Sequence, residues 1–353
     1  MATMAGLTLL GIFILLFFLS VTEYRPSGTE KLIIRKKGIV FPEENMTFSF
    51  LTWNIGYGGL GKEMDFFYDG GKRVRPEKEE FFSYLNGIRT TLARFDSVDF
   101  IFLQEIDSAS KRSYEADEIT VMDGLLPDYA YAFAKNYDCR FIPVPLLHPV
   151  GKVFAGLALF TKYEPLNPER IAFNSHFPWP KRLVFLKRCF LVMRFPLENK
   201  KELVILNTHN SAFDKGGLLR KEELQRLHGF MISEFNKGNF VVAGGDWNNN
   251  PRGYHPGMIN SGDLSFSVDL PIKDSFLPGW EFAFDPKIPT NRDVDMPYVK
   301  GKTRTTIIDF FVVSPNVKVD FIRTISAGFE YSDHNPVFMK VELITGGTES
   351  LKP

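Results

Sequence analysis

The chain has 353 residues, of which 42 are Lys or Arg and 42 are Asp or Glu, so its net charge is zero at neutral pH. This balance gives no overall field to attract a polyanion, although a local basic groove is compatible with it, and nucleic acid is neither indicated nor excluded. Cys139 and Cys189 are too few for a disulfide framework and lack the spacing of a zinc site. They either pair with each other in an exported domain or are small buried residues.

The first predicted element is the apolar run Ala5–Val21, which contains 17 residues and no charge. Its length lies at the lower limit for a membrane-spanning helix, and it is apolar on every face, unlike a helix at the edge of a core. A cleaved secretory signal would begin with positive charge and end in a small-residue cleavage site, and neither is present. We therefore expect an uncleaved anchor with a polar stalk over residues 1–30, with a cleaved signal as the alternative. Either places the rest of the chain outside the cytoplasm.

The remaining chain, about 320 residues, fits one domain over residues 31–346 with a tail over 347–353. Phe48–Asn54 is predicted to be the first strand. Apolar residues between Phe81 and Phe95 then recur at spacings of four and three, which predicts an amphipathic helix. The run Val98–Leu103 has the length and composition of a buried strand. Further strands are predicted over Tyr129–Phe133, Gly156–Thr161, Cys189–Phe195 and Leu203–Asn207.

A second helix is predicted around Leu224–Phe235, followed by a strand over Asn239–Ala243. Trp247–Lys302 is rich in Pro, Gly and Asp, and a loop of this length in a compact domain is usually functional, so we expect it to frame the substrate. Strands over Thr306–Val313 and Val337–Leu343 complete the domain. Each half alternates strands with one long helix, which predicts two sheets packed face to face with helices outside.

Polar residues follow or lie within several of these predicted strands, and such residues usually converge on one site. Cleavage of a phosphodiester needs a divalent cation, an oriented water or base, and a donor for the leaving oxygen. Carboxylates, amides and imidazoles in this mixture suit magnesium or manganese better than zinc. The motifs are Trp53-Asn54, Gln104-Glu105, Thr208-His209-Asn210, Gly245-Asp246-Trp247-Asn248, Ile308-Asp309-Phe310 and Ser332-Asp333-His334.

Each motif alone has a simpler explanation, since a strand-end Asp or Asn is most often a turn residue or a helix cap. The ordered set is more specific. Over Phe48–Leu343 it resembles the endonuclease/exonuclease/phosphatase superfamily, which includes deoxyribonucleases, apurinic endonucleases, neutral sphingomyelinases and inositol polyphosphate 5-phosphatases. The resemblance implies an α/β fold, a four-layer α-β-β-α sandwich of two mixed, mainly antiparallel sheets, and a phosphoryl hydrolase that depends on Mg²⁺ or Mn²⁺.

The resemblance also implies roles by position. Glu105 corresponds to the principal metal ligand, with Asn54 beside it on metal or phosphate, and Asp333 to a further ligand or a partner of the histidine. His334 corresponds to the residue paired with Asp309. Asp246 and Asn248 correspond to the pair that orients water or protonates the leaving group, and His209 to the donor that binds a phosphate oxygen.

The expected activity is that of a monomeric phosphodiesterase or phosphatase acting outside the cytoplasm, held to the membrane by Ala5–Val21. Its substrate is a phospholipid headgroup, a nucleic acid or an inositol phosphate. An extracytoplasmic nuclease is the alternative, and a steep dependence on salt would favour it. A catalytically idle binding module is the second alternative, and it would be favoured by the absence of stabilisation by magnesium.

Two loops leave their roles open. Met64–Gly71 is either a loop pinned by aromatic packing or a substrate lid. His176–Arg182 alternates aromatic and basic residues, which suits an ordinary surface loop, with contact to lipid headgroups or stacking on a base as alternatives.

Overall fold

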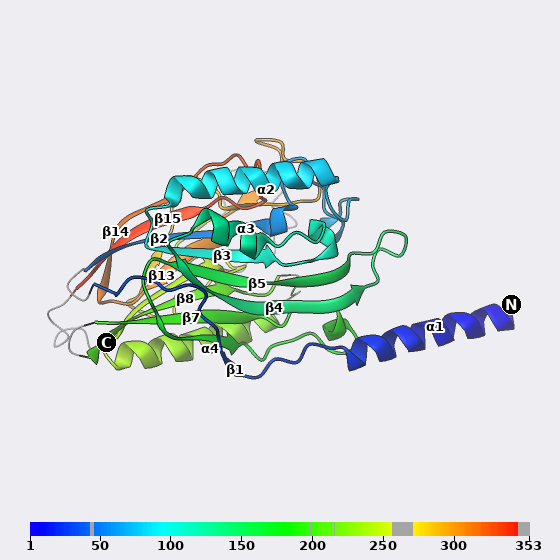
Figure 1. Cartoon of the computed structure of the whole chain (residues 1–353), viewed down its shortest axis with the longest axis horizontal. Helices are drawn as coiled ribbons and strands as arrows, with labels where there is room; N and C mark the ends of the chain where they lie inside the picture. Colours follow the sequence, from blue (N-terminus) through cyan, green and yellow to red (C-terminus); the bar gives the residue numbers. More distant parts are fainter. Residues whose placement is uncertain (43–45, 198–199, 213, 215, 256–270, 345–353) are drawn as a thin grey trace.

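The computed structural model describes residues 1–42, 46–197, 200–212, 214, 216–255 and 271–344. Two β-sheets lie face to face within this part of the chain, and Figure 1 shows α2 outside one sheet and α4 outside the other. Most neighbouring strands are antiparallel, and β2–β3 and β8–β9 are parallel. The predicted α/β sandwich of two mixed, mainly antiparallel sheets is therefore confirmed.

The larger sheet has seven strands among the described residues, in the order β1 (Thr29–Lys31), β6 (Leu166–Ala172), β7 (Cys189–Pro196), β8 (Glu202–His209), β9 (Phe240–Asp246), β13 (Asp309–Val313) and β10 (Glu281–Ala283). The other described sheet has six, in the order β14 (Val317–Thr324), β15 (Val337–Leu343), β2 (Thr47–Asn54), β3 (Phe100–Asp107), β5 (Gly151–Thr161) and β4 (Ala130–Ile142). Two short strands, β11 (Asn291–Arg292) and β12 (Thr305–Thr306), pair with each other beside the sheets.

The two long helices of the domain each connect a parallel strand pair. α2 (Lys78–Leu92) leads from β2 to β3, and α4 (Leu218–Asn236) leads from β8 to β9. α2 begins with a capping box, in which Glu77 and Glu80 each bind the other's backbone N–H. Parallel neighbours need such a crossover, and their C-terminal ends then lie at the same edge of the sheet. The topology therefore brings the polar ends of β2, β3, β8 and β9 to one end of the sandwich.

Apolar side chains fill the space between the sheets and beneath each helix. Phe50 and Phe311 belong to different sheets, and their ring centroids lie 6.1 Å apart in the central layer. Ile88 of α2 is buried on the six-stranded sheet, and Leu227 and Met231 of α4 are buried on the seven-stranded sheet. The high phenylalanine content, 35 residues, thus supplies much of the core.

α1 (Ala2–Val21) leaves the domain at one end (Figure 1). It is the one helix in the described part of the chain that is long and apolar enough to cross a membrane. Its last turns contact the domain, where Leu19 is buried in a cluster with Tyr137 and Ile142. The remaining helices among the described residues are α3 (Glu118–Leu125) and 3-10 turns at Gly56–Gly58, Phe67–Asp69, Ala93–Phe95, Lys111–Ser113 and Lys181–Leu183.

The structure also contains elements that the periodicity did not predict. β6 and β14 lie near sheet edges, and β14 exposes half of its side chains, so neither has the apolar signature of a buried strand. Trp247–Lys302 is not one continuous loop, since it includes β10 and β11, while residues 256–270 and the tail 347–353 lie outside the described residues. Thr29 and Glu30 of the predicted stalk pair with β6. Cys139 and Cys189 are buried and free.

Candidate functional site

The predicted site residues meet where the parallel strands end. Asn54 is in register with Gln104 across β2 and β3, and His209 is in register with Asp246 across β8 and β9. Asp246 in turn faces Asp309 on β13. The register of both sheets thus places these polar groups at one edge, as their strand-end positions predicted.

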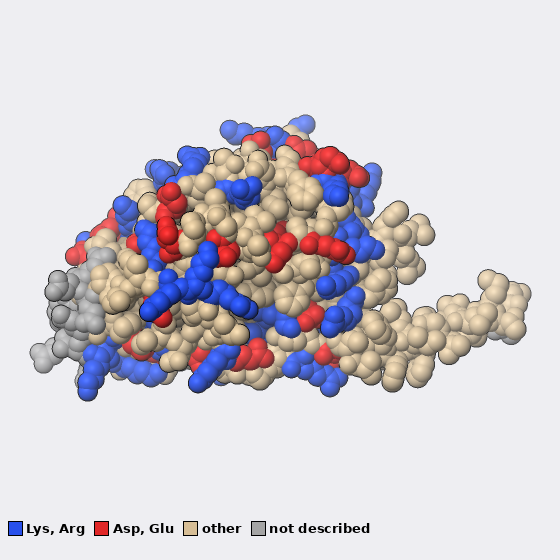
Figure 2. Space-filling view, in the orientation of Figure 1, with Lys and Arg blue, Asp and Glu red and all other residues tan. Residues whose placement is uncertain are grey.

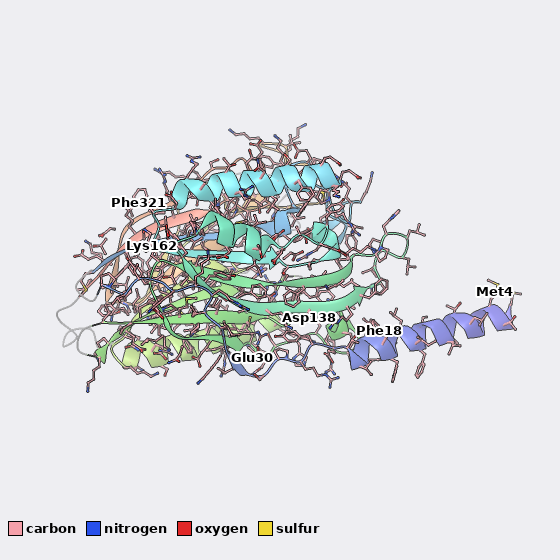
Figure 3. The ribbon with its side chains drawn as sticks, in the orientation of Figure 1. Met4, Phe18, Glu30, Asp138, Lys162 and Phe321 are labelled. Atoms are coloured by element: carbon pink, nitrogen blue, oxygen red, sulfur yellow. The ribbon has the colours of Figure 1, made fainter. Side chains whose placement is uncertain are left out.

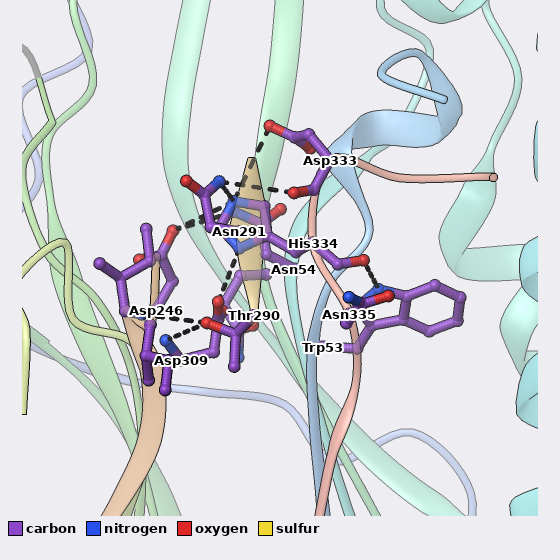
Figure 4. Close-up of polar contacts among 12 residues, drawn as sticks. Trp53, Asn54, Asp246, Thr290, Asn291, Asp309, Asp333, His334 and Asn335 are labelled. Atoms are coloured by element: carbon purple, nitrogen blue, oxygen red, sulfur yellow. Dashed lines mark hydrogen bonds and ion pairs between the residues drawn. The ribbon is translucent and has the colours of Figure 1, made fainter. Parts of the chain in front are cut away.

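His334 and Asp309 form a buried pair at the centre of this site (Figure 4). The Nδ1 atom of His334 lies 2.8 Å from the Oδ2 atom of Asp309, and the amide of Asn291 lies 3.0 Å from Nε2. The indole N–H of Trp53 donates to the backbone carbonyl of His334, and the hydroxyl of Ser332 accepts from its backbone N–H. His334 is therefore held at both ring nitrogens and at its backbone.

The charge of the site differs between its two histidines. Burial acts to lower the pKa of His334, but the carboxylates of Asp309, Asp333 and Asp246 outweigh burial and raise the pKa to about 10. Burial and the nearby guanidinium of Arg188 hold the pKa of His209 well below its ordinary value. His334 is thus cationic at neutral pH and His209 is neutral.

Asp246 links the site's other polar groups. Its Oδ2 atom accepts from Asn54 Nδ2 at 3.0 Å and lies 3.3 Å from Nε2 of His209. Its Oδ1 atom accepts from the backbone N–H of Asn248, whose φ of 47° turns the chain back toward the strand end. Burial, together with Asp309, raises the pKa of Asp246 to about 7. The Asn248 amide itself donates to the carbonyl of Asn210.

Glu105 is presented to solvent by a bulge. The register between β3 and β5 shifts between Leu103 and Ile106, and Glu105 has a φ of 52° in that interruption. A left-handed conformation costs a non-glycine residue about 1 kcal/mol or more, and such strain is typical of functional positions. The Glu105 side chain is 25% exposed and accepts from Asn54 Nδ2 at 3.3 Å.

These groups face a cavity of about 1070 Å³ whose acidic side could hold a cation. Burial raises the pKa of Asp333 to about 6, and the Glu105 carboxylate adds to the rise. Burial also raises the pKa of Asp69 to about 7, again with Asp333 and Glu105 contributing. Oxygen donors that repel one another in this way fit a hard divalent cation, which would relieve the repulsion.

A second group of ligand types lies deeper. One donor atom from each of Asp246, Asp309 and His334 lies within 4.8 Å of the others. Two of these three residues, His334 and Asp309, already bond each other through Nδ1 as an acid-imidazole pair, so their atoms are not free to bind a metal ion. The side of the cavity with Glu105, Asp333 and the Asn54 amide therefore fits a metal ion better.

Sequence reasoning missed two side chains of the cavity. Asp69 belongs to the Met64–Gly71 loop, which backbone hydrogen bonds to Val294 and Arg73 pin in place. Arg188 is only 9% exposed, lines the cavity, and its Nη1 atom is buried with no hydrogen-bond partner among the described residues. Its one sequence signal was its basic pair with the preceding lysine, directly before a predicted strand.

Beneath the candidate site residues, a buried amide pair joins the two sheets. Gln104 of β3 donates through Nε2 to Oδ1 of Asn207 on β8, at 2.7 Å. Asn207 Nδ2 donates to the carbonyls of Leu103 and Ala158 at 3.1 and 2.9 Å. Glu105 and His209 come one and two residues after this pair, so the bridge sets the spacing of the two sides of the site.

Comparison with known proteins agrees with this architecture. A family model described as the endonuclease/exonuclease/phosphatase family matches residues 51–334. No curated protein matches the chain by sequence. Among solved structures, an endonuclease/exonuclease/phosphatase from Beutenbergia cavernae aligns at 15% identity with a TM-score of 0.52, covering 85% of this chain and 72% of that one.

Two further structures have the same fold. A family protein from Leptotrichia buccalis aligns at 14% identity and a TM-score of 0.53, covering 84% of this chain and 100% of its own. D. rerio TDP2, complexed with a single-strand DNA product, aligns at 14% identity and a TM-score of 0.51, with coverage of 84% and 100%. At these identities the likeness extends to the fold.

Proposed function

The chain belongs to the endonuclease/exonuclease/phosphatase family, whose members are in general phosphoester hydrolases, and we propose that it is a divalent-metal-dependent phosphodiesterase or phosphatase that acts outside the cytoplasm. One observation carries the proposal. A cationic imidazole paired with Asp309 lies in the same cavity as an acidic set around Glu105, with Asp246 beside both.

Each polar residue of the site has its own role in the attack of water on phosphorus. Asp246, with a pKa raised to about 7, accepts the proton of the attacking water, since a base works best when its pKa lies near the working pH. Asn248 fixes one carboxylate oxygen of Asp246 through its backbone N–H. His334, kept cationic by Asp309, stabilises the negative charge that develops on phosphoryl oxygen. Neutral His209 donates a hydrogen bond to a non-bridging oxygen.

Glu105 and Asp333 would hold the cation, and Asn54 holds the Glu105 carboxylate through its amide nitrogen while its amide oxygen accepts from the backbone N–H of Gly56. When bound, a divalent cation neutralises charge on the phosphate and lowers the pKa of water. Arg188 completes the site, because a buried guanidinium whose Nη1 atom has no partner among the described residues suits a phosphate oxygen.

We further propose that α1 is an uncleaved anchor. Its 20 residues, at 1.5 Å rise each, match the thickness of a bilayer core. With the exception of its last turns, its apolar side chains are exposed, so it does not serve as a core helix of this domain.

The test is hydrolysis by the full chain in mild detergent, with Mg²⁺ or with chelator. Bis-p-nitrophenyl phosphate, plasmid DNA, sphingomyelin and an inositol polyphosphate are offered in parallel. Glu105→Gln and His334→Ala are expected to lose at least 100-fold in rate, while Glu222→Gln, an exposed carboxylate on α4, should match the wild type.

Cleavage of plasmid DNA with a steep salt dependence would establish the nuclease alternative. Silence on every substrate, together with no stabilisation by Mg²⁺, would contradict catalysis and favour a binding module.

A further inference from the structure

The active-site cavity has an apolar wall as well as a catalytic one. Its lining includes Val74, Tyr137, Ile142 and Val150, which belong to one buried cluster. Leu19 of α1 is buried in the same cluster. The end of the proposed anchor and the apolar side of the cavity are therefore parts of a single packing unit.

A second apolar feature projects from this end of the molecule. The loop of residues 143–149 joins β4 to β5, and Figure 1 shows it extending in the same direction as α1. Leu146 and Leu147 at its tip are 87% and 88% exposed. Its base is fixed, because Arg75 donates to the carbonyls of Lys111 and Pro149. Large apolar side chains held out on a fixed loop mark an interaction surface.

The segment His176–Arg182 adds to this surface. Phe177 lines the cavity, with the Lys181 ammonium 3.6 Å from its ring centroid, and Trp179 is 54% exposed. Figure 2 shows Lys and Arg side chains across this face of the domain, including the end from which α1 and the loop project, with Asp and Glu among them. Exposed basic residues within four positions of a cavity-lining residue include Lys111, Arg140, Lys152 and Lys181, and the exposed Lys302 lines the cavity itself.

We propose that the loop 143–149, Trp179 and the first four of these basic residues form a second membrane-contact surface, which holds the cavity mouth against a bilayer containing anionic lipids. Three features favour a bilayer as the occupant: the shared orientation with α1, the apolar tip and the basic surroundings. The substrate is then a phosphoester in the headgroup of a membrane lipid. The apolar part of this lipid runs along the wall formed by Val74, Tyr137, Ile142 and Val150. This inference rests on the proposed function of the same site.

The surface can be detected without any assay of activity. The chain has four tryptophans, and Trp53, Trp247 and Trp280 are at most 3% exposed, which leaves Trp179 as the exposed one. The full chain is reconstituted in phosphatidylcholine–phosphatidylglycerol vesicles with lipids brominated near the headgroup. We expect the fluorescence of Trp179 to be quenched and the quenched fraction to vanish in Trp179→Phe. Equal fluorescence with and without bromine would overturn the proposal.

The substrate class is tested with the tip leucines. In the double variant Leu146→Glu and Leu147→Glu, release of soluble phosphorus from vesicles of phosphatidylcholine, phosphatidylglycerol and sphingomyelin should fall at least 10-fold. Hydrolysis of bis-p-nitrophenyl phosphate should stay within 2-fold. Phe321→Glu is the matched control, because Phe321 is 45% exposed and lies at the opposite end from α1 (Figure 3).

The outcomes separate this inference from the function on which it rests. Hydrolysis of the soluble diester with no release from vesicles, or with equal release by the double variant, would overturn the lipid inference alone. If the wild type neither hydrolyses the soluble diester nor releases phosphorus from vesicles, the proposed function is contradicted. Quenching of Trp179 would still decide whether the surface contacts lipid.

Discussion

The buried bridge between Gln104 and Asn207 provides a quantitative test of how the fold builds the site. Asn207→Ala removes three hydrogen bonds of 2.7 to 3.1 Å, each contributing about 1 kcal/mol net. It also leaves the buried Gln104 amide with a single partner, Thr52. We expect the free energy of unfolding to fall by about 3 kcal/mol, and the rate of phosphoester hydrolysis to fall with it, because the bridge sets the distance between Glu105 and His209.

The assay is urea unfolding of the full chain in mild detergent, and the fluorescence of the buried tryptophans reports the transition. Gln104→Ala and the double variant complete a double-mutant cycle. The sum of the two single losses in unfolding free energy should exceed the loss in the double variant by about 1 kcal/mol or more. Asn86→Ala is the control, since Asn86 is exposed on α2. A loss below 1 kcal/mol for Asn207→Ala, or strict additivity, would show that the bridge does not stabilise the two sheets as a unit.

Three further predictions follow from the same contacts. Asp309→Asn should lower kcat about 100- to 1000-fold with little change in KM, because His334 loses the carboxylate that holds it cationic. Arg188→Met should lower kcat/KM about 30- to 100-fold through loss of one charge-assisted bond to phosphate, and Arg188→Lys should recover part of it. Glu234, whose pKa is held at about 2 by Arg194 despite burial, should stabilise the fold above about pH 4.5. Glu234→Gln should therefore cost about 2 kcal/mol at pH 7, in urea unfolding, and the cost should disappear as the pH falls toward 2.

Matched controls make these outcomes decisive. Arg226→Met removes an exposed guanidinium of α4 and should leave kcat/KM unchanged. A similar loss in Arg226→Met and Arg188→Met would contradict a phosphate contact. For Asp309→Asn, wild-type kcat would contradict the paired imidazole, and a Glu234→Gln cost that persists at pH 2 would contradict the sign of the linkage.

The convergence of the candidate site residues was predictable because their positions follow from local pattern. Asn54, Glu105 and Asp246 end apolar runs, and parallel strands that end together bring such residues to one edge. The pairing of His334 with Asp309 was implied by the resemblance to the family, and the structure contains it. The layered fold followed from the alternation of strands with two long helices.

The remaining features depend on contacts that periodicity does not encode. In the sequence, Arg188 looks like any basic residue before a strand, and only the fold buries it at the cavity. Likewise, Asp69 joins the acidic group of the cavity because the fold brings its loop near Asp333. The Gln104–Asn207 bridge joins residues more than 100 positions apart. Edge strands such as β14 lack an apolar run because one side of them meets solvent.

Metal binding and catalysis at the Glu105 site can be measured together on one preparation. The chelated full chain in detergent is titrated with Mg²⁺ while its melting temperature and its hydrolysis of bis-p-nitrophenyl phosphate are followed, for wild type, Glu105→Gln and Glu222→Gln. Wild type and Glu222→Gln should gain stability and activity over the same Mg²⁺ range, and Glu105→Gln should gain neither. Activity that persists in chelator, or Glu105→Gln behaving as wild type, would contradict the account.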